Sequence, residues 1–396
     1  MLHNIRVLDI GRYVAGPYCA ALLGSLGAEV IRVEKPSGGE DRFISPLTEA
    51  ADGTPCEGGL FMQTAYGKKS VTLNLGTPEG RDLLVKLALS ADIIVANMPL
   101  KALARLKLDW DSLEKVHPSC ILVTQSAFGD TGPDADKGGF DGVAQALSGA
   151  MYLTGDPGNP VKAGAPYVDY ATAVMSAFAT LAALIQKQET GKGQHVQTSL
   201  LGTALSVMNA HLAEQAVTCK NRIGTGNRVQ TSAPSDVFAT IDGHVLIHTV
   251  GDNIFAKWAK MVGRPELIDD PRCQGDQKRG DNRDFLCDIM QGWCAGKNTD
   301  TVLQALETAG VPCGPVYSMQ EALDSPQVAA MNFFKAVSVP GTDKTAPVVG
   351  LPASFSAFEP AMPETPPTIG ADTEAVLAEL GVSIEDIRGF KEKGIV

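Results

Sequence analysis

The first half of the chain alternates short apolar segments with helix-like segments, and this rhythm constrains the fold more than any other feature. Residues 6–10, 29–34, 70–75, 92–96 and 120–125 are predicted strands. Helix signals lie between them: Pro17 suits the first turn of a helix that closes near Gly27, and Thr77 followed by Pro78 predicts a capped helix start. Strands separated by helices form a parallel sheet with helices on its faces. We therefore expect an α/β fold with a large Rossmann-like domain.

The character of the sequence changes after about residue 219. Residues 237–248 predict a β-hairpin closed by the two-residue turn Asp242-Gly243. Helical patterns follow at 253–261 and 299–308, which indicates a smaller α+β domain over residues 222–331, preceded by a linker at 201–221. Residues 337–368 are rich in proline and poor in periodicity, so we expect an extended return, then short helices at 373–380 and 383–391.

Length, charge and cysteine usage exclude several classes of protein. A chain of 396 residues is long enough for two domains. The formal net charge of -12 argues against a nucleic-acid partner and against an anionic membrane surface. Eight cysteines without a Cys-x-x-Cys pair, together with no signal-peptide pattern, predict reduced thiols in a cytoplasmic protein. Six scattered histidines argue against a metal site, and we expect no membrane-spanning segment.

Asp169 is the most conspicuous single residue, because it stands where a long apolar helix is predicted to begin. The helix carries small and apolar residues on nearly every side, so its first turn should face something other than bulk water. The N–H groups and dipole of a buried helix start favour an anion, and an ionised carboxylate is a nucleophile toward an activated acyl carbon. Aspartate is also a favoured N-cap residue, and capping alone would explain it. The sequence leaves both interpretations open.

Several short motifs, taken in order, carry a resemblance to a known family. They begin with Val7-Leu-Asp-Ile10 and Val14-Ala-Gly-Pro17, and continue through residues 26–35 and Asn97 with Arg105. Residues 139–149, the Asp169 helix with its Thr-Gly-Lys-Gly-Gln end, and residues 309–316 complete the series. Each motif is weak alone, but their order and spacing run through nearly the whole chain. Together they resemble the class III CoA-transferases, a family that has alpha-methylacyl-CoA racemase as a relative.

The resemblance implies a reaction and an assembly. In that family the aspartate that matches Asp169 attacks an acyl-CoA thioester to give a mixed anhydride, and an aspartyl-CoA thioester follows. The implied partners are small carboxylic acids and an acyl-CoA, for which succinyl-CoA is a candidate. CoA arrives as part of this substrate, so no tightly bound cofactor is expected. The resemblance also implies one large domain made from residues 1–200 and 332–396, with the smaller domain inserted. It implies an interlocked, ring-like homodimer as well.

The resemblance also places the CoA and acyl contacts. Tyr13, Val14 and Ala15 match a loop that helps to shape the acyl pocket, and Val14 stands where formyl-CoA transferases carry a polar residue, which argues against formyl or oxalyl substrates. Lys35 matches a basic residue at the adenine or phosphate end, and Arg105 matches an arginine that contacts a phosphate, a role suited to its planar fork. The remaining expected CoA contacts are Lys68, Lys69, Asn97, Met98, Lys137 and Phe140.

Four other functions compete with CoA transfer as interpretations of this sequence. A racemase of this family needs a histidine where the chain has Phe140, and a phenyl ring cannot carry a proton. A CoA-binding protein without turnover would leave Asp169 incidental. A nicotinamide-dependent oxidoreductase needs Gly-x-Gly-x-x-Gly, whereas residues 11–16 lack the middle glycine. A serine hydrolase needs a Gly-x-Ser-x-Gly elbow, which the sequence lacks. The racemase and the non-catalytic binder stay open as alternatives.

Overall fold

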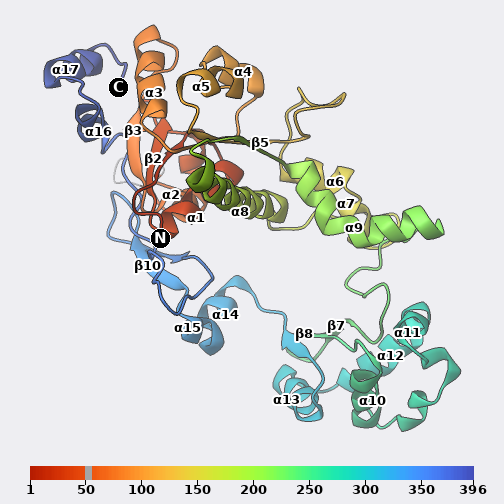
Figure 1. The fold of residues 1–396 in the computed structure, drawn as a ribbon. Helices are drawn as coiled ribbons and strands as arrows, with labels where there is room; N and C mark the ends of the chain where they lie inside the picture. Colours follow the sequence, from red (N-terminus) through yellow and green to blue (C-terminus); the bar gives the residue numbers. More distant parts are fainter. Residues whose placement is uncertain (50–55) are drawn as a thin grey trace. The chain divides into compact units, whose positions relative to one another are not determined.

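The computed structural model describes residues 1–49 and 56–396, and its chain divides into two compact units (Figure 1). Unit 1 comprises residues 1–148, 164–208 and 329–396. Unit 2 comprises residues 149–163 and 209–328. Residues 201–221, for which we expected a linker, instead lie almost entirely in helix α9 (Leu200–Thr218). The local pattern there is small and apolar, which suits a helix as well as a connection.

Unit 1 is built on a six-stranded sheet with the strand order β3-β2-β1-β4-β5-β6. All five neighbouring pairs are parallel, so the predicted parallel sheet is confirmed. The strands are β1 (Arg6–Asp9), β2 (Glu29–Glu34), β3 (Lys69–Thr72), β4 (Ile93–Ala96), β5 (Ile121–Ser126) and β6 (His195–Ser199). The sequence did not reveal β6, because its residues His-Val-Gln-Thr-Ser are mostly polar, as an edge strand allows.

Helices cover both faces of this sheet, because successive strand residues point to opposite sides. Val7, Ile93 and Val95 belong to a core that includes residues of α1 (Ala15–Ser25) and α8 (Tyr167–Thr190). Leu8 and Ile94 belong to a second core on the other face. The helices on that face are α3 (Pro78–Leu89), α4 (Leu100–Arg105), α5 (Trp110–Val116), α16 (Thr373–Glu379) and α17 (Ile384–Glu392). Two buried cores on opposite faces define a doubly wound α/β layer.

Helix α8 packs against α1 and against strands β5 and β6. It is 24 residues long, as expected for the long apolar helix predicted there. Its buried hydroxyls are largely satisfied within the helix, since Ser176 donates to the carbonyl of Thr172 at 2.7 Å and Thr180 to that of Ser176 at 2.7 Å. By length and composition alone it would also suit a membrane span. Its packing on the sheet identifies it as a core helix of unit 1.

Residues near the end of the chain complete the outer edge of the sheet at β3. The amide of Ser70 donates to Asp372 Oδ2 at 2.8 Å, and the amide of Thr72 donates to Thr373 Oγ1 at 3.0 Å. Asn74, just beyond the strand, donates to the carbonyl of Ile395 at 2.7 Å. Unpaired strand edges invite association with other chains, so this cover protects β3. Within unit 1, the C-terminal segment is therefore held against the outer strand of the sheet by single hydrogen bonds.

The remaining elements of unit 1 include two features absent from the sequence analysis. An antiparallel pair, β10 (Phe334–Ser338) with β11 (Thr345–Val349), overlaps the start of the segment predicted as an irregular return. The α2 helix (Gly59–Ala65) contacts β11. Helix α6 (Asp141–Leu147) lies against α8. The predicted helices near the end are confirmed as α16 and α17.

Unit 2 holds a three-stranded antiparallel sheet with the order β7-β8-β9. The predicted hairpin is confirmed: β7 (Asp236–Ala239) pairs with β8 (His244–Ile247), and the amide of Thr240 donates to the carbonyl of Gly243 at 3.0 Å. Trp258 belongs to the core of this unit and is fully buried. The other elements of unit 2 are α7 (Ala150–Leu153), α10 (Asp252–Met261), α11 (Asp276–Asp281), α12 (Arg283–Cys294), α13 (Thr299–Ala309), β9 (Cys313–Pro315) and α14 (Met319–Asp324), while α15 (Pro326–Met331) lies at its boundary.

Candidate active site

The strand order reverses between β1 and β4, and the loops that follow these two strands meet at that point. Asn97, directly after β4, accepts a hydrogen bond from the amide of Arg12 at 2.8 Å and donates to the carbonyl of Arg12 at 2.7 Å. In open parallel sheets, ligands bind beyond the carboxyl ends of strands at such a reversal. Asn97 therefore fixes the backbone of the loop where a ligand is expected.

Helix α1 begins immediately after this loop, and its buried first turn has no capping side chain. Its N-cap residue is Val14, which supplies no side-chain hydrogen bond, and its first turn holds no acidic residue. The first N–H groups of a helix have no partner within the helix. Nearby, Gln125 at the end of β5 donates to the carbonyl of Ala15 at 3.1 Å, while its Oε1 atom is buried without a partner among the described residues. Unused donors and an unused acceptor thus lie together at the start of α1.

A small buried cluster joins the start of α1 to the starts of α6 and α8. Its members are apolar residues from four helices: Ala15, Ala144, Val168, Leu200 and Ala204. Val168 directly precedes Asp169 in the first turn of α8. This cluster brings Asp169 into the same region of unit 1 as the loop after β1.

Asp141, rather than Asp169, caps helix α8. The Asp141 Oδ2 atom accepts hydrogen bonds from the amides of Val168 at 2.7 Å and Asp169 at 3.1 Å. The N-cap residue of α8 is Pro166, and Asp169 lies inside the first turn. The alternative that Asp169 serves only as an N-cap is therefore wrong. Its carboxylate accepts no hydrogen bond from the described part of the chain, which leaves it available for chemistry.

The environment of Asp169 changes its acidity. Burial disfavours the ionised form, and the neighbouring negative charge of Asp141 adds to this, so the pKa of Asp169 is raised to about 6. A carboxylate with this pKa is ionised at neutral pH and is more basic than an ordinary aspartate. Perturbed carboxylates of this kind are concentrated at functional sites.

Two aromatic side chains border the same region. Tyr13, in the loop after β1, and Phe140, directly before α6, contact each other edge to face with ring centroids 5.4 Å apart. Both rings remain accessible, with 37% and 62% of their surface exposed. Because Phe140 is adjacent to Asp141, this pair links the expected acyl-pocket loop to the start of α8. The structure thus brings together Tyr13, Val14, Ala15, Asn97, Phe140 and Asp169.

Four other residues expected to contact CoA lie outside this group of site residues. Lys35 follows β2 and is paired with Glu40 at 2.6 Å on the surface. Lys137 is exposed in the loop after β5 and is paired with Asp134 at 2.5 Å. Arg105 ends helix α4 and is exposed, with no ion pair to any described residue. Met98 follows Asn97 and packs its partly buried side chain against the second core.

The predictions for Lys68 and Lys69 are corrected by the structure. Lys68 has a fully buried side chain, and its ammonium donates to Asp9 Oδ2 at 2.7 Å and to the carbonyl of Pro17 at 2.7 Å. All of its hydrogen-bonding is directed inward, so it does not offer a charge to a ligand. Lys69 begins β3 and pairs with Glu29 at 2.6 Å, at the amino end of the parallel strands. Ligands bind at the opposite end.

Asp141 and Gln125 are site residues that the sequence analysis missed. Asp141 stood inside a recognised motif, and its position at the start of α6 was a usable signal, since acidic residues favour helix starts. Its two partners at the start of α8, Val168 and Asp169, lie 27 and 28 residues further along the chain. No local sequence pattern reveals such a contact. Gln125 ends a buried strand, and a polar residue there is a weak indication of a ligand.

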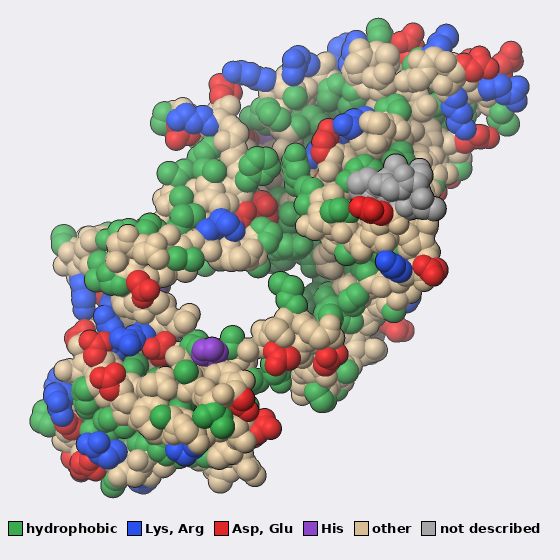
Figure 2. Space-filling view, turned by 180° about the vertical axis from the view of Figure 1, so that it is seen from behind, with side chains coloured by type: hydrophobic (Ala, Val, Ile, Leu, Met, Phe, Trp, Pro, Cys, Tyr) green, Lys and Arg blue, Asp and Glu red, His purple; other side chains and the backbone are tan. Residues whose placement is uncertain are grey.

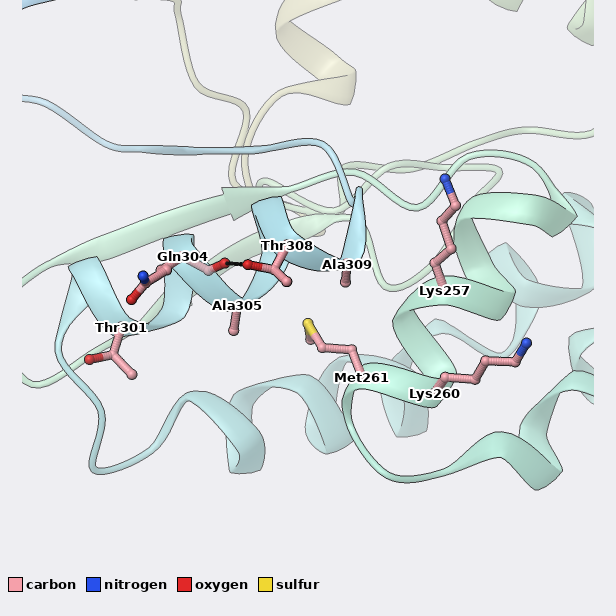
Figure 3. A pocket seen from close by; sticks show the side chains of 8 residues that line it. All are labelled: Lys257, Lys260, Met261, Thr301, Gln304, Ala305, Thr308 and Ala309. Atoms are coloured by element: carbon pink, nitrogen blue, oxygen red, sulfur yellow. Dashed lines mark hydrogen bonds between the residues drawn. The ribbon is translucent and has the colours of Figure 1, made fainter.

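Another hollow, in unit 2, is unsuited to the chemistry. It measures about 740 Å³ and lies between α10 and α13 (Figure 3). Its lining side chains are Lys257, Lys260, Met261, Thr301, Gln304, Ala305, Thr308 and Ala309. None of these is a carboxylate, cysteine or histidine, so the hollow offers no acid, base or strong nucleophile. Within residues 1–49 and 56–396, no cluster of His, Cys, Asp and Glu could hold a metal ion.

The geometry defines an open α/β protein with an uncapped helix start and an available carboxylate at the reversal of its sheet. Comparison with known proteins agrees with this class. The model of CoA-transferase family III matches residues 2–373. The chain therefore belongs to CoA-transferase family III, and it is an enzyme of that class.

Three relatives show how far this similarity extends. A succinate--glutarate CoA-transferase of Agrobacterium fabrum is 33% identical over 96% of this chain and 95% of its own length. A succinyl-CoA--D-citramalate CoA-transferase of Chloroflexus aurantiacus is 32% identical over 100% of this chain and 98% of its own. Among solved structures, a CAIB/BAIF family protein from Brucella suis superimposes with a TM-score of 0.83 at 30% identity, covering 95% of this chain and 98% of that one.

Proposed function

We propose that this enzyme moves CoA from a dicarboxylic acyl-CoA to a second small carboxylic acid, with Asp169 as the covalent nucleophile. The observation that carries the proposal is that two neighbouring aspartates have different roles. Asp141 satisfies the amides at the start of α8, and the Asp169 carboxylate is left without a hydrogen-bond partner among the described residues, with its pKa raised to about 6. A partly desolvated, ionised carboxylate is a stronger nucleophile than a solvated one.

The reaction has four reversible substitutions. The Asp169 carboxylate attacks the thioester carbonyl of the donor and expels CoA thiolate, which leaves an acyl–aspartyl anhydride. The thiolate attacks the aspartyl carbonyl and releases the donor acid, which leaves an aspartyl–CoA thioester. The acceptor carboxylate then attacks that thioester, expels the thiolate and forms a second anhydride. Attack of the thiolate on the acceptor's carbonyl gives the new acyl-CoA and restores Asp169.

Each substitution places negative charge on a carbonyl oxygen, and the start of α1 is suited to stabilise that charge. Its N–H groups have no capping side chain, and Ala15 belongs to the same buried cluster as Val168. Backbone donors held in place before the reaction are effective at a developing oxyanion. The small side chains of Ala15 and Gly16 allow an acyl group to approach the backbone there.

Two observations favour dicarboxylic substrates over formyl or oxalyl ones. The relatives at 32–33% identity are named for succinate, glutarate and citramalate. In this chain the loop after β1 carries buried Val14 and the Tyr13 ring, which meets Phe140. An apolar and aromatic wall accommodates the methylene groups of a four- or five-carbon chain better than a compact dianion.

The test is to trap the aspartyl intermediate and map its position. Enzyme incubated with succinyl-CoA and hydroxylamine should lose activity and carry a hydroxamate on Asp169, detected by peptide mass spectrometry. Enzyme treated with hydroxylamine alone is the control. Loss of activity without a modification at Asp169 would contradict the covalent route. Running the exchange in deuterated water separates a racemase, which would label the alpha carbon, from a transferase, which would not.

We also propose that the enzyme is a homodimer and that it works in the cytoplasm. Helix α8 carries large apolar side chains at helical spacing on its exposed face, among them Val174, Phe178 and Ile185, which are 53%, 69% and 62% exposed. Apolar side chains also reach the surface in the space-filling view, where acidic and basic groups are interspersed (Figure 2). Such a row of apolar side chains favours burial against a second chain. Light scattering, which measures the mass of the assembly, would test the dimer.

The cysteines support the cytoplasmic location. All eight are free thiols, as a reducing compartment maintains. Cell fractionation would test this location.

A further inference from the structure

The loop after β1 is held by three side chains, one for each successive amide. The amide of Gly11 donates to Asp9 Oδ1 at 2.9 Å, and that of Arg12 donates to Asn97 at 2.8 Å. The amide of Tyr13 donates to Asp41 Oδ2 at 3.1 Å. A loop in which three successive N–H groups are bound by side chains has few conformations left. The contact at Tyr13 differs from the other two, because Asp41 comes from a separate segment beyond β2.

Asp41 is itself held by a buried arginine. Both of its oxygens accept hydrogen bonds from Arg32 Nη2, at 2.7 and 2.9 Å, and the side chains of Asp41 and Arg32 are 1% and 0% exposed. Two further nitrogens of Arg32 are buried without a hydrogen-bond partner among the described residues, and Glu34 Oε2 lies 4.0 Å from Nε. Asp41 is therefore the principal partner of this arginine. A paired, fully buried carboxylate is a rigid acceptor.

Tyr13 needs such a restraint, because its backbone is in the left-handed region with φ at 62°. That conformation costs a non-glycine residue roughly 1–2 kcal/mol and persists only where surrounding contacts enforce it. In this conformation the Tyr13 ring meets Phe140, and Phe140 precedes the aspartate that binds the start of α8. Left free, the loop would relax and the ring would leave Phe140.

We propose that Asp41 is a positioning residue for CoA transfer: through the amide of Tyr13 it holds the Tyr13–Phe140 wall in place beside Asp169. This role rests on the proposed function, since Asp41 touches no reacting atom and acts only through Tyr13. The Arg32–Asp41 pair is then part of the catalytic support, although it is buried beneath the site. Misplacing a substrate-positioning group by about 1 Å can cost on the order of a hundredfold in rate.

Asp41→Asn tests the role, because an amide has one donor end and one acceptor end. Its NH2 group faces a donor whichever way the amide turns: Arg32 Nη2 at the position of Oδ1, or both the Tyr13 amide and Arg32 Nη2 at the position of Oδ2. Asp276→Asn is the matched control: Asp276 likewise accepts from a backbone amide, that of Gly251 at 2.9 Å, and from a buried arginine, Arg279, but it lies in unit 2 and does not touch the loop. We expect kcat/KM for transfer to fall at least about tenfold in Asp41→Asn and less than about threefold in Asp276→Asn. Equal losses of kcat/KM would overturn the proposal.

A double-variant cycle with Tyr13→Gly shows whether Asp41 acts through Tyr13. Glycine adopts the left-handed conformation without strain and lacks the ring. In the Tyr13→Gly background, Asp41→Asn should lower kcat/KM by less than about twofold, since nothing remains to be positioned. Losses that multiply would show that Asp41 acts by another route. Arg32→Lys keeps the charge but loses the fork, and it serves as a second variant if Asp41→Asn does not fold; it should repeat the same pattern.

Asp169→Asn in the same assay separates this proposal from the proposed function. Transfer that survives in Asp169→Asn overturns the covalent route. Transfer that is abolished there, with multiplying losses at Asp41 and Tyr13, overturns the positioning role alone.

Discussion

Helices α3 and α8 both begin with well-satisfied amides, but they obtain their caps differently. In α3 the cap is local, since Thr77 Oγ1 accepts from the amide of Gly80 at 3.1 Å. In α8 the cap comes from Asp141, which lies in another helix. The remote cap frees the acidic residue of the first turn of α8. The comparison shows how a helix can keep its stability while a carboxylate at its start is left for chemistry.

Asp169→Asn should produce the largest effect. The amide is nearly the same size and keeps the cap from Asp141, but it cannot form the acyl anhydride. We expect transfer to fall at least about a thousandfold, as for other removed nucleophiles, with CoA binding and fold retained. Steady-state transfer rates and calorimetric CoA binding are the measurements. Near-normal turnover would show that Asp169 is not the nucleophile.

Asp141→Ala should have the next largest effect, because it removes both hydrogen bonds at the start of α8. We expect a loss of about 1–2 kcal/mol in stability and a fall of about ten- to a hundredfold in kcat as Asp169 loses its fixed position. Thr77→Ala in α3 is the matched control: it should cost about 1 kcal/mol and leave kcat unchanged. Denaturant unfolding and transfer kinetics measure both. Equal kcat in the two variants would contradict the special role of the remote cap.

The pH dependence of transfer should report the raised pKa of Asp169. Only the ionised form is a nucleophile, so kcat/KM should be constant above pH 7 and fall about tenfold per pH unit below the pKa of about 6. Asp141→Asn removes the second cause of the raised pKa, so its acid limb should move to lower pH. A pH profile that breaks near 4 in the unaltered enzyme would contradict the raised pKa.

A smaller effect is expected on stability, and its sign is opposite to that of a paired carboxylate. Because the pKa of Asp169 is raised from 3.8 to about 6, the folded state binds more protons than the unfolded state between these values. Stability due to this group is present below pH 4 and is lost as pH rises through 6. Asp169→Asn should therefore stabilise the protein at pH 8 by on the order of 1 kcal/mol, reduced by partial exposure, and not at pH 4. Urea unfolding at both pH values measures this.

The same contrast between local and remote contacts explains what the sequence could predict. The Thr77 cap and the Asp242-Gly243 hairpin involve residues a few positions apart, and both predictions are confirmed. The parallel sheet follows from apolar periodicity and is also confirmed. The identification of Asp169 depended on its place at a helix start, which the structure bears out.

What failed depends on contacts between distant segments. Lys68 was expected to contact CoA, but it pairs with Asp9, 59 residues away, and is buried. The cap that Asp141 gives to α8 and the hydrogen bond from the Tyr13 amide to Asp41 likewise form only when the folded sheet brings their segments together. The β10–β11 pair was missed because it lies in a proline-rich stretch with little alternation. Nothing in these local patterns distinguishes a buried ion pair from a solvated charge.

The cover that residues 372–395 place over β3 has a consequence for synthesis. Ser70, Thr72 and Asn74 obtain their partners from a segment that the ribosome makes some 300 residues later. During translation the outer edge of β3 therefore stays uncovered until the C-terminal segment has been made. The intervening unit emerges earlier and can fold first. For this enzyme, molecular chaperones would be needed most in that interval, and shielding of the early strands would matter more than help with the final steps.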